Sequence, residues 1–178
     1  MSRNAKVSTM AEQQPTHTQN PILPRSSTLE GVREWLYNMS NNLPASIDEL
    51  PSGFYDALLL QGTRVDHAEP GRIVCSLIVP PRLVNSGNFL HGGAIAAFVD
   101  IIGSAAIFTT GAKSSGVSVE INVSYLDAAK SGEEIEIEGK VLRVGRAIAF
   151  VTVELRKKTG KLVAQGRHTK YLAVTSKL

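Results

Sequence analysis

The chain has 178 residues, of which 43% are hydrophobic and 20% are charged, as is usual for one globular domain. Lys and Arg number 19 against 16 Asp and Glu, and aromatic residues make up only 6%. A nucleic-acid-binding protein needs a basic stripe with stacking side chains, so this balance argues against that class. The single cysteine, Cys75, cannot form an internal disulfide. The longest near-apolar run, residues 94–108, contains Asp100 and is too short to span a bilayer.

The first part of the chain differs from the rest in composition. Sixteen of the first 28 residues are Ser, Thr, Asn, Gln or Pro, and seven are apolar. Such a stretch buries too little surface to offset the entropy lost on ordering, which predicts a disordered polar tail over residues 1–28. Because this tail is poor in acid and contains Arg3, Lys6 and Arg25, an organelle transit peptide is the alternative interpretation.

The last residues, 175–178, form a candidate targeting tail. They end in Ser176-Lys177-Leu178, and a C-terminal Ser-Lys-Leu is bound by the peroxisomal import receptor. A given tripeptide at one fixed position is rare by chance, so the ending favours a peroxisomal location over coincidence after a final strand.

Helical signals come first between these two tails. Ser27 and Glu30 form a capping box, and apolar residues at helical spacing follow as far as Met39. A second, short helix is expected at residues 54–60. A third, long helix is expected at residues 91–110, ended by Gly111 at the C′ position. It is apolar on nearly every face, which is typical of a helix buried on all sides.

Strands are expected on both sides of the long helix. Two precede it, joined by a turn at Glu69-Pro70-Gly71, and four follow it with short turns between them: 63–67, 72–79, 117–125, 133–144 with a bulge near Gly139, 147–156 and 161–174. Strands joined by short turns pair antiparallel. The sequence therefore predicts an α+β fold in which a curved antiparallel sheet wraps around one long buried helix, preceded by an N-terminal helical segment.

Asp100 lies in the middle of the long apolar helix. Its neighbours three and four positions away include Ala96, Ala97, Gly103 and Ser104, and none of them can form an ion pair with it. Burying a lone carboxylate is unfavourable, so the position needs a reason. An acid in a narrow apolar slot suits a general base or a nucleophile. The alternative is a structural carboxylate bonded to a backbone group or to a partner chain.

The start of the same helix is a candidate oxyanion site. The first N–H groups of a helix are unpaired and lie at the positive end of its dipole. In His91-Gly92-Gly93 the glycines let a ligand approach the backbone closely, as the oxyanion of an acyl-transfer intermediate requires. Asn85, just upstream, can add an amide donor. The alternatives are an ordinary tight turn for His91-Gly92-Gly93 and a turn residue for Asn85.

These residues together resemble a known family. The order Asn85, His91-Gly92-Gly93, Asp100 and then four antiparallel strands is similar to the PaaI-like branch of hotdog-fold acyl-CoA thioesterases, especially the thioesterase superfamily member 2 type and its plant relatives. The likeness covers residues 29–174, which we take as one hotdog domain. It implies hydrolysis of an acyl-CoA substrate to free acid and CoA, without metal or organic cofactor.

The resemblance also implies roles for single residues. Asp100 acts as base or nucleophile, the N–H group of Gly92 polarises the thioester carbonyl, and Ser118 orients the attacking water. Asn85 and His91 support the thioester end. Segments that contact CoA in the family match the following residues: Tyr125, Lys130, Arg143, Gly145, Arg146 and Tyr171. For the charged residues among them, solvated turn charge is an equal alternative.

Two competing functions stay open at this point. The first is a non-catalytic acyl-CoA-binding hotdog protein, because a fold does not determine a function. Such a protein has no need of a carboxylate beside the thioester, so Asp100 favours the enzyme. The second is a hotdog dehydratase, whose catalytic histidine belongs to a longer signature that this sequence lacks. The acyl group, fatty or aryl, is not readable from the sequence.

The spacing of the two candidate groups predicts an oligomer. Gly92 and Asp100 are eight residues apart, which is roughly 12 Å along one helix. An oxyanion site and an attacking group must meet at a single carbon atom. Two antiparallel helices of a two-fold homodimer bring the start of one helix to the middle of the other. We expect a homodimer and, from the hotdog resemblance, a dimer of dimers, which is a homotetramer.

Removing Ser176-Lys177-Leu178 is expected to leave enzymatic activity intact and to abolish import into peroxisomes, because the receptor binds the free C-terminal tripeptide and not the folded domain. Microscopy of a reporter that carries residues 169–178 at its own C-terminus tests the signal alone, with the same reporter lacking the tripeptide as control. A reporter that carries these residues and stays in the cytosol contradicts the assignment.

Overall fold

The structure is a computed structural model that describes residues 50, 53–114 and 116–172. The chain divides into two compact units, Met1–Ala45 and Ser46–Leu178, and all described residues belong to the second unit. Three expectations lie outside the described residues and stay predictions: the polar tail 1–28, the helix that begins at the capping box, and the targeting tail 175–178. The boundaries 29–174 of the expected domain stay a prediction as well.

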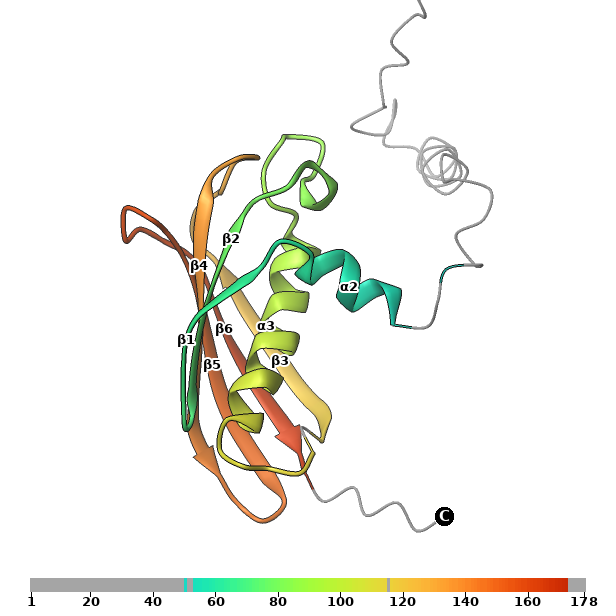
Figure 1. Cartoon of the computed structure of the whole chain (residues 1–178), viewed down its shortest axis with the longest axis vertical. Coiled ribbons are helices and arrows are strands. Elements are labelled where there is room, and N and C mark those ends of the chain that lie inside the picture. Colours follow the sequence, from blue (N-terminus) through green and yellow to red (C-terminus); the bar gives the residue numbers. More distant parts are fainter. Residues whose placement is uncertain (1–49, 51–52, 115, 173–178) are drawn as a thin grey trace, which may run out of the picture. The chain divides into compact units, whose positions relative to one another are not determined.

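A six-stranded antiparallel sheet wraps around one long helix (Figure 1). The strands are β1 (Arg64–Glu69), β2 (Arg72–Ile78), β3 (Val117–Tyr125), β4 (Glu134–Val144), β5 (Ile148–Lys157) and β6 (Leu162–Tyr171). Their order across the sheet is β1-β2-β4-β5-β6-β3, and all neighbours pair antiparallel. The helical elements are α2 (Phe54–Leu60), a 3₁₀ turn (Pro81–Leu83) and the long α3 (Gly92–Phe108). This architecture confirms the predicted fold class.

The core lies between α3 and the sheet. The buried residues of α3 recur at helical spacing and are Ala94, Ile95, Phe98, Val99, Ile102, Gly103, Ala106 and Ile107. They pack with inward-facing strand residues such as Ile137 and Val153, which are fully buried. Ala97 and Ile101, on the other side of the helix, are only half-buried. The sheet covers one side of α3, so the single chain does not bury the helix on all sides as expected.

Apolar and polar residues alternate along the sequence of β3, but the pairing with β6 shifts between Ser118 and Glu120, and most of the strand is exposed. It occupies an edge of the sheet beside β6, and within the described residues no strand pairs with its other edge. Val117 and Val119 are 53% and 64% exposed, although both are apolar. An apolar edge strand of this kind invites pairing with another chain.

The irregularity in β4 lies three residues beyond the predicted bulge. Pairing with β5 shifts between Val141 and Arg143 and not at Gly139. Gly139 is instead a close-packing position, because a Cβ atom there would lie 2.9 Å from the carbonyl oxygen of Ile102 on α3. The alternation slips at Gly139 because the helix leaves no room for a side chain.

Both predicted glycine signals are confirmed. Gly71 has a φ of +83° and, after Pro70, joins β1 to β2, while Gly111 has a φ of +84° just beyond the end of α3. Among the described residues, no helix has the length and apolar character that crossing a membrane would require.

Asp127 ties the loop between β3 and β4 to the hairpin between β5 and β6. Its Oδ2 atom lies 3.1 Å from Nζ of Lys157 and 3.1 Å from Nζ of Lys161. Hydrogen bonds from these two ammonium groups lower the pKa of Asp127 from its ordinary 3.8 to about 2. Two residues further on, the Ala129 carbonyl accepts a hydrogen bond of 2.7 Å from the N–H group of Leu90. The ion pairs therefore steady a loop that lies beside the start of α3.

Asp127→Asn is expected to destabilise the domain at neutral pH, because the amide forms no ion pair with Lys157 or Lys161. The folded-state pKa is lowered, so the stabilisation is fully present above pH 3.8 and is lost as the pH falls towards 2. Chemical unfolding of both proteins from neutral pH to about pH 3 measures the difference. Glu120→Gln, the same type of change at an exposed residue of β3, is the control. A difference that does not shrink on acidification contradicts this account.

Candidate active site

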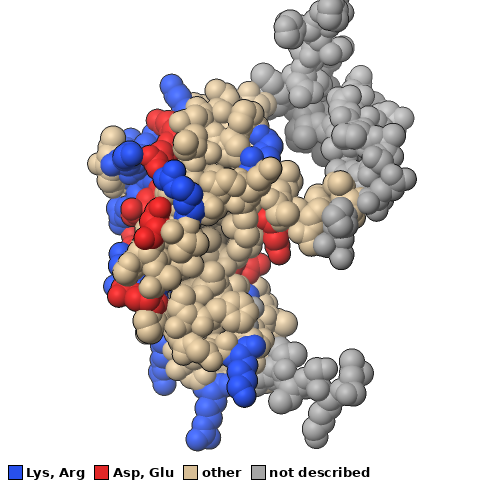
Figure 2. Space-filling view, viewed as in Figure 1, with Lys and Arg blue, Asp and Glu red and all other residues tan. Residues whose placement is uncertain are grey.

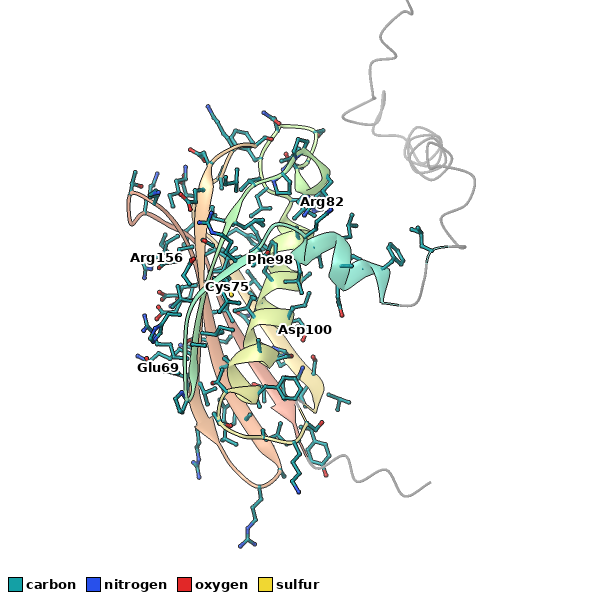
Figure 3. The ribbon with its side chains drawn as sticks, viewed as in Figure 1. Glu69, Cys75, Arg82, Phe98, Asp100 and Arg156 are labelled. Carbon is teal, nitrogen blue, oxygen red and sulfur yellow. The ribbon has the colours of Figure 1, made fainter. Side chains whose placement is uncertain are left out.

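A polar cluster surrounds Asp100, the only charged residue of α3 (Figure 3). Oδ1 of Asp100 lies 3.3 Å from Oγ of Ser118 on β3 and 3.4 Å from Nζ of Lys170 on β6. Nε2 of His168, also on β6, is 3.6 Å from the same oxygen. The structure thus brings the predicted pair Asp100 and Ser118 into contact and adds two basic residues that sequence reasoning missed.

Strand β6 supplies both basic residues because side chains on alternate positions of a strand face the same side. Gly166, His168 and Lys170 all face α3 and are buried. The imidazole of His168 fits beside Gly103, where a Cβ atom would lie 3.1 Å from its Nδ1 atom. At Gly166 a Cβ atom would collide with the side chain of Val99. Small residues on the helix and the strand therefore make room for the cluster.

His168 is a buried, neutral imidazole. Burial lowers its pKa below the ordinary 6.5, and the positive charge of Lys170 lowers it further. The Asp100 carboxylate and the nearby Val99 carbonyl act in the opposite direction and do not outweigh these causes. The Val99 carbonyl lies near the ring, but Nδ1 makes no hydrogen bond of ordinary geometry.

The hydrogen bonds of the cluster run in one direction. Nε2 of His168 lies 2.9 Å from Oγ of Ser118. The Asp100 carboxylate can only accept, so the single hydroxyl proton of Ser118 points to Asp100. His168 then donates to Ser118, which donates to Asp100. Ser118 and Lys170 both donate to Oδ1 of Asp100, and Oδ2 has no hydrogen bond to any described residue.

Lys170 corrects the expectation of an unpaired carboxylate. It is only 4% exposed, and its Nζ atom donates to Oγ of Ser104 at 2.6 Å and to Asp100 at 3.4 Å. The expectation was wrong because it considered only neighbours along the helix, whereas the partner is 70 residues away on β6. The Asp100 side chain is itself 42% exposed, so its free oxygen can be reached from outside.

The start of α3 has the features of an oxyanion site. His91 caps the helix, and its Nδ1 atom accepts a hydrogen bond of 2.8 Å from the N–H group of Gly93. In the neutral ring the proton therefore sits on Nε2, which makes that atom a donor. The first N–H group of the helix, that of Gly92, has no hydrogen-bond partner among the described residues. The N–H group of Gly92 and the Nε2–H group of His91 are thus two donors available at the start of α3.

Tyr125 lies against this helix start. Its hydroxyl donates a hydrogen bond of 3.1 Å to the carbonyl oxygen of Gly92, and a Cβ atom at Gly92 would lie 3.4 Å from its ring. The Tyr125 side chain is 54% exposed. Of the residues predicted to contact CoA, Tyr125 therefore borders the candidate oxyanion site directly.

Asn85 and Lys130 flank the same end of the helix. Oδ1 of Asn85 accepts hydrogen bonds from the N–H groups of Gly87 at 2.9 Å and Phe89 at 3.2 Å. This geometry is that of the turn residue named as the alternative, and the exposed side-chain amide nitrogen has no partner among the described residues. Lys130 is exposed and forms a bridge with Phe89. Both residues therefore contact Phe89, which lies in the segment just before α3.

The remaining predicted CoA contacts lie at the opposite end of the molecule. Arg143, Gly145 and Arg146 belong to the end of β4 and its turn to β5, which lies beyond the last turn of α3 (Figure 1). Tyr171 ends β6 at the same side and pairs with Val117. The lower end of the molecule in Figure 2 shows Lys and Arg without neighbouring Asp or Glu. One chain therefore does not bring all predicted contacts together.

No set of metal ligands is present in residues 50, 53–114 and 116–172. No three His, Cys, Asp or Glu side chains in this part of the chain converge to hold an ion. Cys75 is 1% exposed, and burial raises the pKa of its thiol, so it packs as a core residue.

The two basic residues that sequence reasoning missed did leave a signal. The alternation in β6 places Gly166, His168 and Lys170 on the face that carries the core, where charged side chains are rare. A buried histidine and a buried lysine two residues apart need an acid partner. The only acid of the long apolar helix, Asp100, was the obvious candidate.

Comparisons with known proteins agree with this geometry. A family model described as the thioesterase superfamily matches residues 87–164. Acyl-coenzyme A thioesterase 13 of Homo sapiens is 45% identical over 106 residues, which are 59% of this chain and 76% of that protein. The crystal structure of zebrafish thioesterase superfamily member 2 has a TM-score of 0.63 and 40% identity, and the match covers 83% of this chain and 100% of that one.

A more distant likeness concerns the fold alone. The PaaI protein of E. coli has a TM-score of 0.59 and 18% identity, over 66% of this chain and 90% of that one. The predicted hotdog fold and the predicted family are confirmed by these matches together. The chain belongs to the thioesterase superfamily, the hotdog-fold thioester hydrolases.

Proposed function

We propose that this protein is an acyl-CoA thioesterase that hydrolyses an acyl-CoA thioester to the free acid and CoA. The observation that carries the proposal is the state of Asp100. Ser118 and Lys170 hold one carboxylate oxygen, the other has no hydrogen-bond partner among the described residues, and the side chain is 42% exposed. A carboxylate held in this way suits either proton abstraction from water or direct attack on a carbonyl carbon. The names of the acyl-coenzyme A thioesterase relatives support acyl-CoA as the substrate.

In the proposed reaction the thioester carbonyl oxygen accepts a hydrogen bond from the N–H group of Gly92 and gains negative charge in the tetrahedral intermediate. His91 Nε2–H is a second donor at this end of the helix. The C–S bond then breaks, CoA leaves as a thiolate and takes up a proton, and water supplies the acid's new oxygen. A single turnover in ¹⁸O-water separates the two roles of Asp100. A base directs labelled water onto the acyl carbon, so the acid carries the label. A nucleophile first forms a mixed anhydride, and water that opens it at the Asp100 carbonyl leaves the label in Asp100 and an unlabelled aspartate oxygen in the acid.

The proposed site is completed by a second copy of the chain. Gly92 and Asp100 are separated by roughly 12 Å along α3, too far to act on one carbonyl. The exposed apolar edge of β3 and the half-buried outer side of α3 support a two-fold dimer. Pairing β3 with its copy sets the two helices antiparallel, so that Gly92 of one chain lies near Asp100 of the other.

The same dimer accounts for the divided CoA contacts. In an antiparallel arrangement the basic end of one copy lies beside the helix start of the other. Lys113, Arg143 and Arg146 are exposed at that basic end and suit the phosphate groups of CoA. The exposed Leu142 and Phe150, on β4 and β5, support further pairing of dimers into the proposed tetramer. The Ser176-Lys177-Leu178 ending supports a peroxisomal location.

Asp100→Asn is expected to keep the fold and to lose about 10²–10⁴-fold in turnover, because the amide is neither a base nor a comparable nucleophile. Release of the CoA thiol, measured with a panel of aliphatic and aryl acyl-CoAs, tests the change. Asp66→Asn, at an exposed position on β1, is the matched control. An Asp100→Asn variant that works at the wild-type rate contradicts the assignment, and a wild type that binds acyl-CoA without cleaving it indicates a binding protein.

Mixing two inactive chains tests the shared site. One chain carries Asp100→Ala and the other Asn85→Ala, provided that the second also proves inactive. Random pairing makes half of the dimers mixed, and each mixed dimer contains one intact site out of two. Activity is therefore expected to recover to about a quarter of wild type. No recovery, with mixed dimers shown to form, would mean that both residues act within one chain.

A further inference from the structure

The proposed reaction gives the buried ammonium group of Lys170 no contact with substrate and no proton transfer, only a contact with one oxygen of Asp100. Lys170 lies on the inner side of Asp100, with 5% of its side chain exposed, away from the accessible carboxylate oxygen. A buried cation is unfavourable unless it is paired and hydrogen-bonded. The position of this buried cation therefore needs an explanation from the groups around it.

Two contacts define the position of this ammonium group. Nζ of Lys170 donates to Oγ of Ser104 at 2.6 Å and to Oδ1 of Asp100 at 3.4 Å. Ser104 and Asp100 are four residues apart in α3, so they lie on the same face in successive turns. Lys170 thus bridges two turns of the helix from the neighbouring strand. Ser104 anchors the ammonium group, and the ammonium group contacts the carboxylate.

No other cation faces Asp100 among the described residues. The rest of α3 carries no charge, and the buried parts of β2, β4 and β5 that face α3 are apolar except for the neutral thiol of Cys75. From β6, His168 is held neutral by burial. On β3, Ser118 does not titrate, and Glu120 lines a cavity on the face of the sheet that is turned away from α3. On α2, Asp56 is exposed to solvent.

We propose that Lys170 is a positioning residue, which uses its bond to Ser104 to place a positive charge beside Oδ1 of Asp100 and to hold that oxygen inward, so that Oδ2 faces the reacting centre. The inference rests on the proposed function and deepens it. An opposite charge within about 4–6 Å favours the ionised form of a carboxylate. The ion pair with Oδ1 also restricts the rotation of the carboxylate plane.

Lys170→Met tests the charge, because methionine has a similar apolar chain and no ammonium group. The acidic limb of the pH profile of kcat/KM is expected to move up by about one pH unit or more. The loss of kcat is therefore largest at low pH and smaller at high pH, while KM changes little. Lys170→Arg, which restores a cation, is expected to return the acidic limb towards its wild-type position. Lys140→Met, the same change at an exposed lysine of β4, is the matched control.

A second measurement does not depend on turnover. NMR titration of ¹³C-labelled aspartate carboxyl groups, with the Asp100 signal assigned from the spectrum of Asp100→Asn, follows the ionisation of Asp100 directly. Its midpoint is expected at higher pH by about one unit or more in Lys170→Met, and unchanged in Lys140→Met. Should Lys170→Met fail to fold, Ser104→Ala serves in its place, because it removes only the anchor of the ammonium group.

The role of Ser104 gives a further check. If Ser104 acts only through Lys170, Ser104→Ala lowers kcat in the wild-type background and has no added effect in the Lys170→Met background. A purely structural lysine would instead lower activity equally at every pH and leave the titration of Asp100 unmoved, and this result overturns the proposal. Absence of hydrolysis by wild type and by Lys140→Met overturns the proposed function, while the NMR titration still decides the role of Lys170.

Discussion

The structure depends on one constraint, which is that a carboxylate set in an apolar helix must be compensated from outside that helix. Helix α3 offers Asp100 no charged neighbour, so its partners come from the sheet. Residues Ser118, His168 and Lys170 occupy inward-facing positions of β3 and β6, where apolar side chains would otherwise complete the core. The fit between α3 and these two strands is therefore set by the cluster as much as by apolar packing.

This constraint explains where the glycines of the interface lie. The imidazole of His168 needs the space that Gly103 leaves on the helix, and the close approach of β6 to α3 needs Gly166 opposite Val99. Both glycines have ordinary backbone angles, so their role is to leave space and not to permit an unusual conformation. The small residues along the helix look like loose packing. They leave the space in which the polar network is buried with most of its groups paired.

Local signals predicted most of the fold but only part of the site. Alternation and turn residues are properties of neighbouring positions, which is why the strands, the α3 helix and the stops at Gly71 and Gly111 were recognisable. The contact between Asp100 and Lys170 joins residues 70 positions apart and exists because β6 packs against α3, a neighbour set by the order of the strands. Strand order is not a local property, so the partner of Asp100 was missed, as was the division of the CoA contacts between two ends.

Strand β3 links the chemistry to the assembly. Near one end it presents Ser118 to Asp100, and at the other end it places Tyr125 against Gly92. The two candidate centres of a single chain are therefore attached to opposite ends of one edge strand. In the proposed dimer, this edge pairs antiparallel with its copy, so the Ser118 end of one chain lies beside the Tyr125 end of the other. A shift of the β3 register by two residues would move the base along the thioester by about 7 Å, so the pairing that holds the dimer together also sets the geometry of attack.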